Sequence, residues 1–272
     1  MKYLNLGCGY TFIQDWTNVD FVSSSKYVIA HDLLKGIPFP DNSFDLVYHS
    51  HVLEHFPRSE AIKFIAECYR VLKPGGVIRV VVPDLEQIAL NYIKYLNESL
   101  ENVAGADQKY EWTLLEMYDQ VVRETPGGEM AAYIKDVSKN NDEFLLSRNG
   151  KEVEGLMKNL RKQDITSVPS GSKLRKFLSS VYHFKFNKAL ERIALKENYE
   201  GYKNSQFRKQ GEIHQWMYDR FSIKKMLEGK GFKNVEKRSA FSSNINEWSD
   251  YKLDGENGMI RKPDSLFMEA IK

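Results

Sequence analysis

Short apolar runs alternate with polar stretches over the first third of the chain. Each run is rich in Val, Ile, Leu or an aromatic residue and is bounded by Gly, Pro, Asn or Asp, which is typical of buried strands. We therefore predict five strands. They lie at 3–6, around 18–20, and at 27–30, 44–48 and 77–82.

One amphipathic helix is predicted between the last two of these strands, at 59–72. Its apolar residues recur at helical spacing; they are Ile62, Ile65, Ala66, Tyr69 and Leu72. The sequence Pro74-Gly75-Gly76 follows and should end the helix.

The connections between the first three strands are unusually short. Eight residues, 10–17, separate the first two strands, and fewer separate the next two. A crossover between parallel strands normally needs about a dozen residues and contains a helix. We expect the first two crossover helices to be stunted or missing.

A long helical region, followed by a return of the α/β pattern, indicates an interrupted domain. The clearest helices of this region are at 85–100, 110–124, 129–138, 151–162 and 173–200. A helix at 221–228 and strands at 234–239 and 265–271 then follow. We predict a discontinuous α/β domain, 1–84 plus 212–272, with a helical insertion at 85–211 that closes the ligand edge and carries specificity.

Composition indicates a folded globular protein. The chain has 272 residues, of which 42% are hydrophobic and 12% aromatic, and contains no apolar run near the roughly 20 residues of a membrane span. Cys8 and Cys68 are the only cysteines, and no signal peptide is evident. The sequence thus predicts a cytoplasmic protein.

The charge is unevenly distributed. Residues 158–209 contain 13 Lys and Arg against 4 Asp and Glu, a net of +9, which leaves −7 for the rest of a chain of net charge +2. Such a segment suggests an anionic partner or peripheral contact with a membrane surface, but a solvated helix face explains it equally well.

Five motifs follow one another in a fixed order. Gly7-Cys8-Gly9 comes directly after the first strand, where glycine lets the backbone approach a ligand. The others are Asn18-Val19-Asp20, Ala30-His31-Asp32-Leu33, the stretch 37–55 that ends in His51-Val52-Leu53-Glu54-His55, and 69–76. This order resembles the class I S-adenosylmethionine-dependent methyltransferases, in particular the type 11 branch, over residues 1–84 and more faintly over 212–272. The segment 214–219 is similar to members associated with surface polysaccharide synthesis.

The resemblance implies a Rossmann-like fold and S-adenosyl-L-methionine as the cofactor. Gly7 and Gly9 would let the backbone approach the cofactor, and Asp20 would bind both ribose hydroxyls. Asn5 stands where many relatives have an acidic residue. A role for Asp20 in capping a turn is the alternative.

Further cofactor contacts follow from the same comparison. Asp32, with Leu33 beside it, matches the position that contacts the adenine amino group, although it too could simply cap a turn. His49 and Ser50 match the segment that faces the sulfonium and the acceptor.

Several side chains are candidates for the base that removes the acceptor's proton. A neutral imidazole, with an unperturbed pKa of about 6.5, suits this task. The candidates are His51, His55 and His214. Asp84, a further candidate catalytic residue, or Glu86 could orient the acceptor.

Two other interpretations of these segments stay open. At their spacing, His51, Glu54 and His55 would share a face of a helical turn, and they could bind a metal; we expect none, because Glu-His pairs also order loops. Trp216 or Tyr218 could stack on a sugar, or could only pack between the insertion and the core.

The sequence therefore predicts O-methylation of a sugar or glycan intermediate. Another small molecule, such as a phenol or a lipid-linked precursor, is the first alternative. A binding protein for RNA or membranes with a vestigial nucleotide fold is the second. We expect a small-molecule or glycan acceptor, with an anionic group as one option, rather than nucleic acid.

Overall fold

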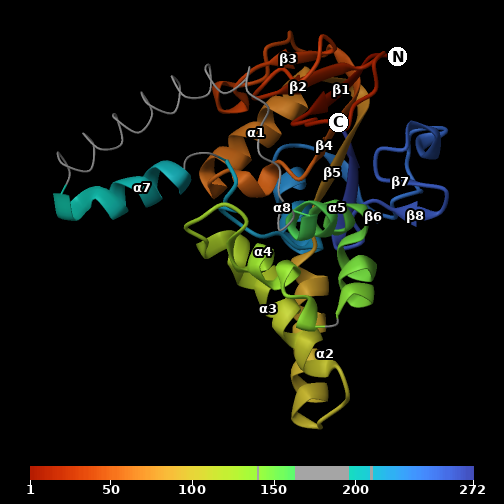
Figure 1. Ribbon diagram of the computed structural model, residues 1–272. Helices are drawn as coiled ribbons and strands as arrows, with labels where there is room; N and C mark the ends of the chain where they lie inside the picture. Colours follow the sequence, from red (N-terminus) through yellow and green to blue (C-terminus); the bar gives the residue numbers. More distant parts are fainter. Residues whose placement is uncertain (140, 163–195, 209–210) are drawn as a thin grey trace.

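A seven-stranded sheet forms the centre of the molecule (Figure 1). The computed structural model describes residues 1–139, 141–162, 196–208 and 211–272. The strand order is β3-β2-β1-β4-β5-β9-β6. The strands are β1 (Tyr3–Leu6), β2 (Thr17–Asp20), β3 (Val28–Ala30), β4 (Phe44–Ser50), β5 (Leu72–Pro83), β6 (Lys233–Arg238) and β9 (Ser265–Ile271).

The sheet is parallel except at one edge. Strands β1 to β5 pair in parallel, whereas β9 lies between β5 and β6 and is antiparallel to both. The carboxyl ends of β1, β2, β4 and β5 therefore meet at one edge, which is where open α/β sheets bind ligands. The predicted Rossmann-like α/β fold is confirmed.

The early crossovers are as short as predicted. In this described part of the chain no helix joins β1 to β2 or β2 to β3, and only the 3-10 turn η1 (Leu33–Lys35) precedes β4. The chain between β1 and β2 instead folds tightly, and the amide of Gly7 donates to the carbonyl of Val19 at 2.8 Å.

Helices α1 (Arg58–Val71) and α8 (Arg220–Glu228) cover one face of the sheet (Figure 1). Their apolar sides pack on the inward residues of the strands in the main hydrophobic core, which includes Ile65, Val80 and Leu227. The predicted end of α1 needs a correction. The helix ends at Val71, and β5 starts at Leu72, because Leu72 pairs with Phe44 of the neighbouring strand β4.

The other face of the sheet is covered without a long helix. The turn η5 (Trp248–Tyr251) and the hairpin of β7 (Gly255–Glu256) and β8 (Met259–Ile260) pack there with a second apolar cluster. The sequence interpretation did not predict these elements. They enclose Arg79, which is 0% exposed.

A helical region extends from the carboxyl edge of β5 (Figure 1). Its elements are α2 (Leu85–Leu100), α3 (Ala106–Val122), α4 (Gly128–Lys135), η3 (Val137–Lys139), α5 (Asp142–Lys162), η4 (Lys196–Asn198) and α7 (Tyr199–Arg208). It has its own apolar core around Trp112 and Leu145. Helix α5 is longer than predicted and is kinked at Gly150. The division at residues 85 and 211 stays a prediction.

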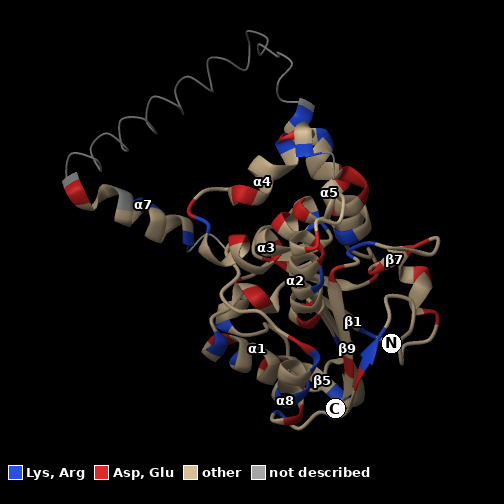
Figure 2. Cartoon of the chain, turned by 90° about the horizontal axis from the view of Figure 1, so that it is seen from below, with Lys and Arg blue, Asp and Glu red and all other residues tan. Residues whose placement is uncertain are grey.

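Most of the basic segment 158–209, and the predicted helix at 173–200 up to residue 195, lie outside the described residues. At its start, Lys158 pairs with Glu154, and Arg161 pairs with Asp142 at 2.6 Å. Figure 2 shows basic and acidic residues mixed along this part of α5. Among the described helices, none has the length and apolar character to span a bilayer.

Candidate functional site

The turn after β1 leaves open space beside its backbone at Gly9. Gly7 and Gly9 have φ values of +63° and +54°, which L side chains rarely adopt. A Cβ on Gly7 would lie 2.2 Å from Cγ2 of Val52, whereas a Cβ on Gly9 would have no neighbour within 4 Å. Gly7 is thus required by packing, whereas the backbone at Gly9 is exposed; we call the turn Gly7–Gly9 the glycine cradle.

Asp20 lies beside this cradle at the end of β2. Its Oδ2 accepts a hydrogen bond from the amide of Gly9 at 2.7 Å, and the side chain is only partly buried. A carboxylate held in this way can accept hydrogen bonds from two adjacent hydroxyls. The glycine cradle and this carboxylate fit the ribose and amino-acid parts of S-adenosylmethionine.

The other predicted cofactor residues of this edge have structural tasks as well. Asn5 is buried, and its Nδ2 donates to the carbonyl of Thr11 at 3.1 Å, so the amide stabilises the loop. Asp32 caps η1 by accepting from the amide of Leu34 at 3.0 Å, which is the turn-capping role considered as an alternative. Leu33 packs partly buried against the main core.

The end of β4 presents different side chains to its two faces. His49 is 0% exposed, packs on Phe64 at a ring-centroid distance of 5.1 Å, and has no hydrogen-bond partner. Burial lowers the pKa of His49 to about 4, so the ring is neutral. Its side chain faces α1, so only its backbone remains for cofactor contact. Ser50 is partly buried at the same edge.

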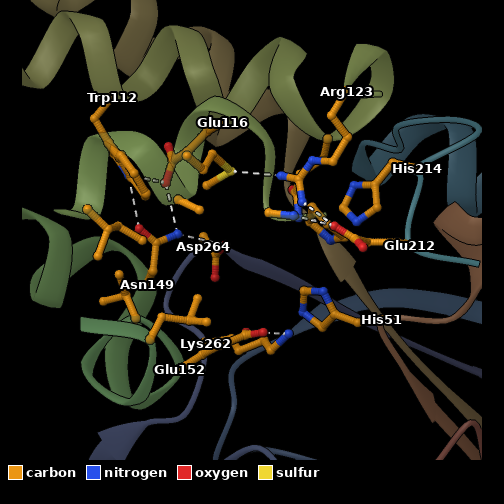
Figure 3. A pocket seen from close by; sticks show the side chains of 18 of the residues that line it. His51, Trp112, Glu116, Arg123, Asn149, Glu152, Glu212, His214, Lys262 and Asp264 are labelled. Carbon is orange, nitrogen blue, oxygen red and sulfur yellow. Dashed lines mark hydrogen bonds and ion pairs between the residues drawn. The ribbon is translucent and has the colours of Figure 1, made fainter. Parts of the chain in front are cut away.

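A cavity of about 600 Å³ lies between the sheet edge and the helical region (Figure 3). His51, Pro83 and Asp264 form its sheet side. Helices α2 to α5 and the segment 212–214 enclose the rest. The apolar lining residues include Ile88, Trp112, Met130, Ile134, Val153 and Leu156; the polar ones include Arg123, Asn149, Glu152, Glu212, His214 and Lys262.

His51 connects the cavity to the glycine turn. It follows β4 directly, has a φ of +54°, and precedes Val52, which packs against Gly7. Its Nε2 lies 2.9 Å from Oγ of Ser265, and its Nδ1 lies 3.1 Å from Oε1 of Glu54. A left-handed backbone at a residue other than glycine is often retained at functional sites.

Glu54 lies beneath the cavity wall, in the 3-10 turn η2 (Leu53–His55). It is 0% exposed; its Oε1 forms an ion-pair contact with Nδ1 of His51, and no other donor reaches either carboxylate oxygen in the described part of the chain. Burial raises the pKa of Glu54, but the contact and charge of His51 and the charges of His214 and His55 outweigh burial and lower it to about 2. The group is an anion at neutral pH.

His55 and His214 meet above this carboxylate. Their ring centroids are 4.9 Å apart at an angle of 81°, and Nδ1 of His55 lies 3.2 Å from the carbonyl oxygen of Ile213. Burial lowers the pKa of His214 to about 3. All three predicted histidine bases therefore line one cavity, and His214 reaches it from a distant part of the sequence.

The prediction of a catalytic Asp84 is corrected. Asp84 is 2% exposed, caps α2 by accepting from the amide of Gln87 at 3.3 Å, and pairs with Lys237 at 3.2 Å. Its carboxylate is occupied by the helix start and does not line the cavity. Glu86 pairs with Arg220 at 3.0 Å, also outside the cavity.

The two predicted stacking residues also lie elsewhere. Trp216 is 43% exposed and stacks with Arg58 at 5.1 Å, and Tyr218 is buried in the main core. Neither lines the cavity. Packing, the alternative interpretation, describes both.

Sequence reasoning missed the polar residues that the insertion contributes. Glu116 is buried beside Arg148, 2.8 Å away, and accepts from the side chains of Trp112 and Asn149. Arg123 pairs with Glu212 at 3.0 Å across the cavity rim. Charged residues at helical spacing in α3 were the available signal, but charged helix faces are usually solvated.

Part of this chain is similar in sequence to known methyltransferases. Residues 14–80 match the family model of a methyltransferase domain. A stretch of 56 residues, 21% of each chain, is 43% identical to a "Probable S-adenosylmethionine-dependent methyltransferase" of Mycolicibacterium smegmatis. Another of 81 residues, 29% of this chain and 31% of the relative, is 36% identical to the ubiquinone/menaquinone biosynthesis C-methyltransferase UbiE of Citrobacter koseri.

The matched regions are short. The alignments cover 21% and 31% of these curated relatives' own length. A solved S-adenosylmethionine-dependent methyltransferase of Archaeoglobus fulgidus aligns over 100% of this chain and 86% of its own, with 12% identity and a TM-score of 0.38. Residues 14–80, which belong to the Rossmann-like sheet, thus match a methyltransferase domain, and part of the chain is similar to a protein named as an S-adenosylmethionine-dependent methyltransferase.

Proposed function

We propose that this protein transfers a methyl group from S-adenosylmethionine to a small molecule bound in the cavity beside His51. The observation that carries this proposal is the position of the cavity. It lies at the carboxyl edge of the sheet, and His51, which lines it, precedes Val52, the residue that packs against Gly7 of the glycine turn. In open α/β folds this edge is where ligands bind.

The chain's residues divide the work between two sites. Gly9 and Asp20 would hold the cofactor, which supplies an electrophilic methyl group when bound. His51 would accept the acceptor's proton at Nε2, where it now contacts Ser265. The negative charge of Glu54, 3.1 Å from Nδ1, would offset the positive charge that the imidazole acquires.

The helical region would exclude water and position the acceptor. Methyl transfer needs the reacting atoms held about 3 to 3.5 Å apart in the correct direction. The side chains of Asn149, Glu152 and Lys262 line the cavity and offer donors and acceptors to hydroxyl groups. This polar lining favours a hydroxyl-bearing acceptor, and we propose a sugar or glycan intermediate.

A second acceptor class is favoured by a different observation. Trp112, Ile134 and Leu156 line the same cavity, and a similar protein is named as a C-methyltransferase of ubiquinone and menaquinone synthesis. An apolar ring or a lipid-linked precursor would use that lining.

Calorimetric titration with S-adenosylhomocysteine tests the proposal first. We expect micromolar affinity that barely changes with salt, and a loss of about 10- to 100-fold in Asp20→Ala, since a bond to a charged group contributes about 1.5 to 3 kcal/mol. Absence of binding would refute the proposal. Strong salt dependence would instead indicate binding to a polyanion.

The acceptor class is decided by turnover. Formation of S-adenosylhomocysteine would be followed with nucleotide sugars and glycans in one panel and with quinols and phenols in another. Turnover confined to the second panel would reject the sugar proposal and leave the methyltransferase proposal intact.

A further inference from the structure

The cavity wall contains a cluster of side chains of the types that bind metals. Methyl transfer with His51 as the base does not need this cluster. We propose that Glu54, His55 and His214 bind one divalent first-row transition metal ion. One ligand atom from each residue lies within 4.8 Å of the other two. Two imidazoles and a carboxylate are a ligand set that suits these ions.

The state of Glu54 is the first argument. Its carboxylate is fully buried, and neither oxygen has a hydrogen-bond donor. Buried charges in proteins are normally paired or coordinate metals. The contact with His51, 3.1 Å away, satisfies at most one oxygen. A cation at this place would pair with the other.

The orientation of His55 is the second argument. Its Nδ1 faces the carbonyl oxygen of Ile213 at 3.2 Å. A carbonyl only accepts, so Nδ1 holds the proton and Nε2 keeps the free lone pair. Metal-binding histidines typically donate their other N–H to a carbonyl or carboxylate in this way.

The backbone fixes the third ligand against the other two. His214 donates its amide to the carbonyl of Gln120 at 2.9 Å, and the amide of Gln215 donates to the carbonyl of Glu54 at 2.7 Å. The segment that carries His214 is therefore tied directly to η2. Ligands on such braced elements need little rearrangement to bind an ion.

Neighbouring charges do not oppose a cation. Arg123, whose charge acts on His214, pairs with Asp119 and Glu212, the latter at 3.0 Å, and Lys262 of the cavity lining pairs with Glu152. Both positive charges are balanced within the described residues of the site.

The cluster is also open on one side. His55 and His214 line the cavity, while Glu54 lies beneath them. Three protein ligands and a free position facing a cavity are characteristic of catalytic metal sites. The role of this free position rests on the proposed function. It would bind an oxygen of the acceptor and favour the loss of that oxygen's proton to His51.

In the experiment, the untagged full chain is first treated with a chelator and then titrated with Co²⁺. Calorimetry and visible absorption measure the binding. We expect one Co²⁺ per chain, with a ligand-field band that reports nitrogen ligands. Glu54→Gln and His214→Ala should each lower the affinity at least about 100-fold, since each removes a direct ligand. His31→Ala is the matched control, because the side chain of His31 contacts the carbonyl of Gly36, at 2.9 Å and outside the cluster, and its loss should leave binding unchanged.

Absence of Co²⁺ binding, or equal binding by Glu54→Gln and His214→Ala, overturns the proposal. Thermal unfolding without metal guards against misfolding. Glu54→Gln and His214→Ala should each keep a cooperative unfolding transition, so that a loss of Co²⁺ binding reports the lost ligand; if one of the two fails to fold, the other decides. Titration of the same metal-free protein with S-adenosylhomocysteine tests the proposed function separately, so that either can fail alone.

Discussion

Replacing Gly7 by alanine should destabilise the protein, whereas the same change at Gly9 should mainly weaken cofactor binding. Both residues have positive φ, so alanine incurs about 1 to 2 kcal/mol of backbone strain at either position. The two positions differ in their surroundings. A Cβ at Gly7 would lie 2.2 Å from Cγ2 of Val52, and a Cβ at Gly9 would enter open space.

The contact with Val52 sets the size of the difference. Val52 is 8% exposed and belongs to the main core, so it cannot move aside into solvent. Overpacking of such a closed core costs about 1 to 3 kcal/mol. Gly7→Ala should therefore lower the free energy of unfolding by about 2 to 5 kcal/mol. Gly9→Ala should lower it by about 1 to 2 kcal/mol.

Urea unfolding of the two variants measures these values, and titration with S-adenosylhomocysteine measures the cofactor. The double variant Gly7→Ala/Val52→Ala is the control, since Val52→Ala removes the obstructing methyl group. Gly7→Ala should therefore destabilise the Val52→Ala protein less than it destabilises the parent protein. Equal destabilisation by Gly7→Ala and Gly9→Ala would refute the assigned packing. Unchanged cofactor affinity in Gly9→Ala would mean that the cradle is not the binding site.

Three further changes test other parts of the structure. His51→Asn, which tolerates the left-handed backbone, should lower turnover by about 10²- to 10⁴-fold at unchanged affinity for S-adenosylhomocysteine; retained turnover would exclude this base. Arg79→Ala should lower the free energy of unfolding by about 3 to 5 kcal/mol in urea, because it leaves the buried carboxylate of Asp254 without its cation and removes the nearer cation of Glu269; a loss under 1 kcal/mol would contradict this network. Glu67→Gln should remove a pH-dependent stabilisation: the hydrogen bond from Arg70 lowers the pKa of Glu67 from its ordinary 4.5 despite partial burial, so the stability difference is full above about pH 5 and shrinks as pH falls through the lowered pKa. Urea unfolding between pH 7 and pH 3 measures it, and a difference that grows on acidification would show the opposite sign.

Local patterns in the sequence were sufficient for the elements whose stability is mostly local. The predicted helix at 85–100 and the predicted strand at 265–271 match α2 and β9 at both ends. Helix α1 was found from its apolar spacing, and the missing crossover helices from the small number of residues between strands. These features follow from periodicity and chain length, which the sequence contains directly.

Elements that depend on distant partners could not be found in this way. Strand β5 begins at Leu72, before a Pro-Gly-Gly sequence that normally ends structure, because Phe44 pairs with Leu72. The short strands β7 and β8 have two residues each, too few for a periodic signal. Tertiary pairing decided both.

The candidate site shows the same division. The sequence alone placed the glycine turn, Asp20 and His51 at the ends of strands, where open α/β folds bind ligands, and it singled out His55 and His214 as candidate bases without placing them side by side. Only the tertiary structure decided that Asp84 caps a helix and that His214, rather than His51, completes the cluster with Glu54 and His55. The physical reason is that a side chain's chemistry depends on what reaches it through space, and the pairing of chain segments far apart in sequence is set by the packing of the whole fold.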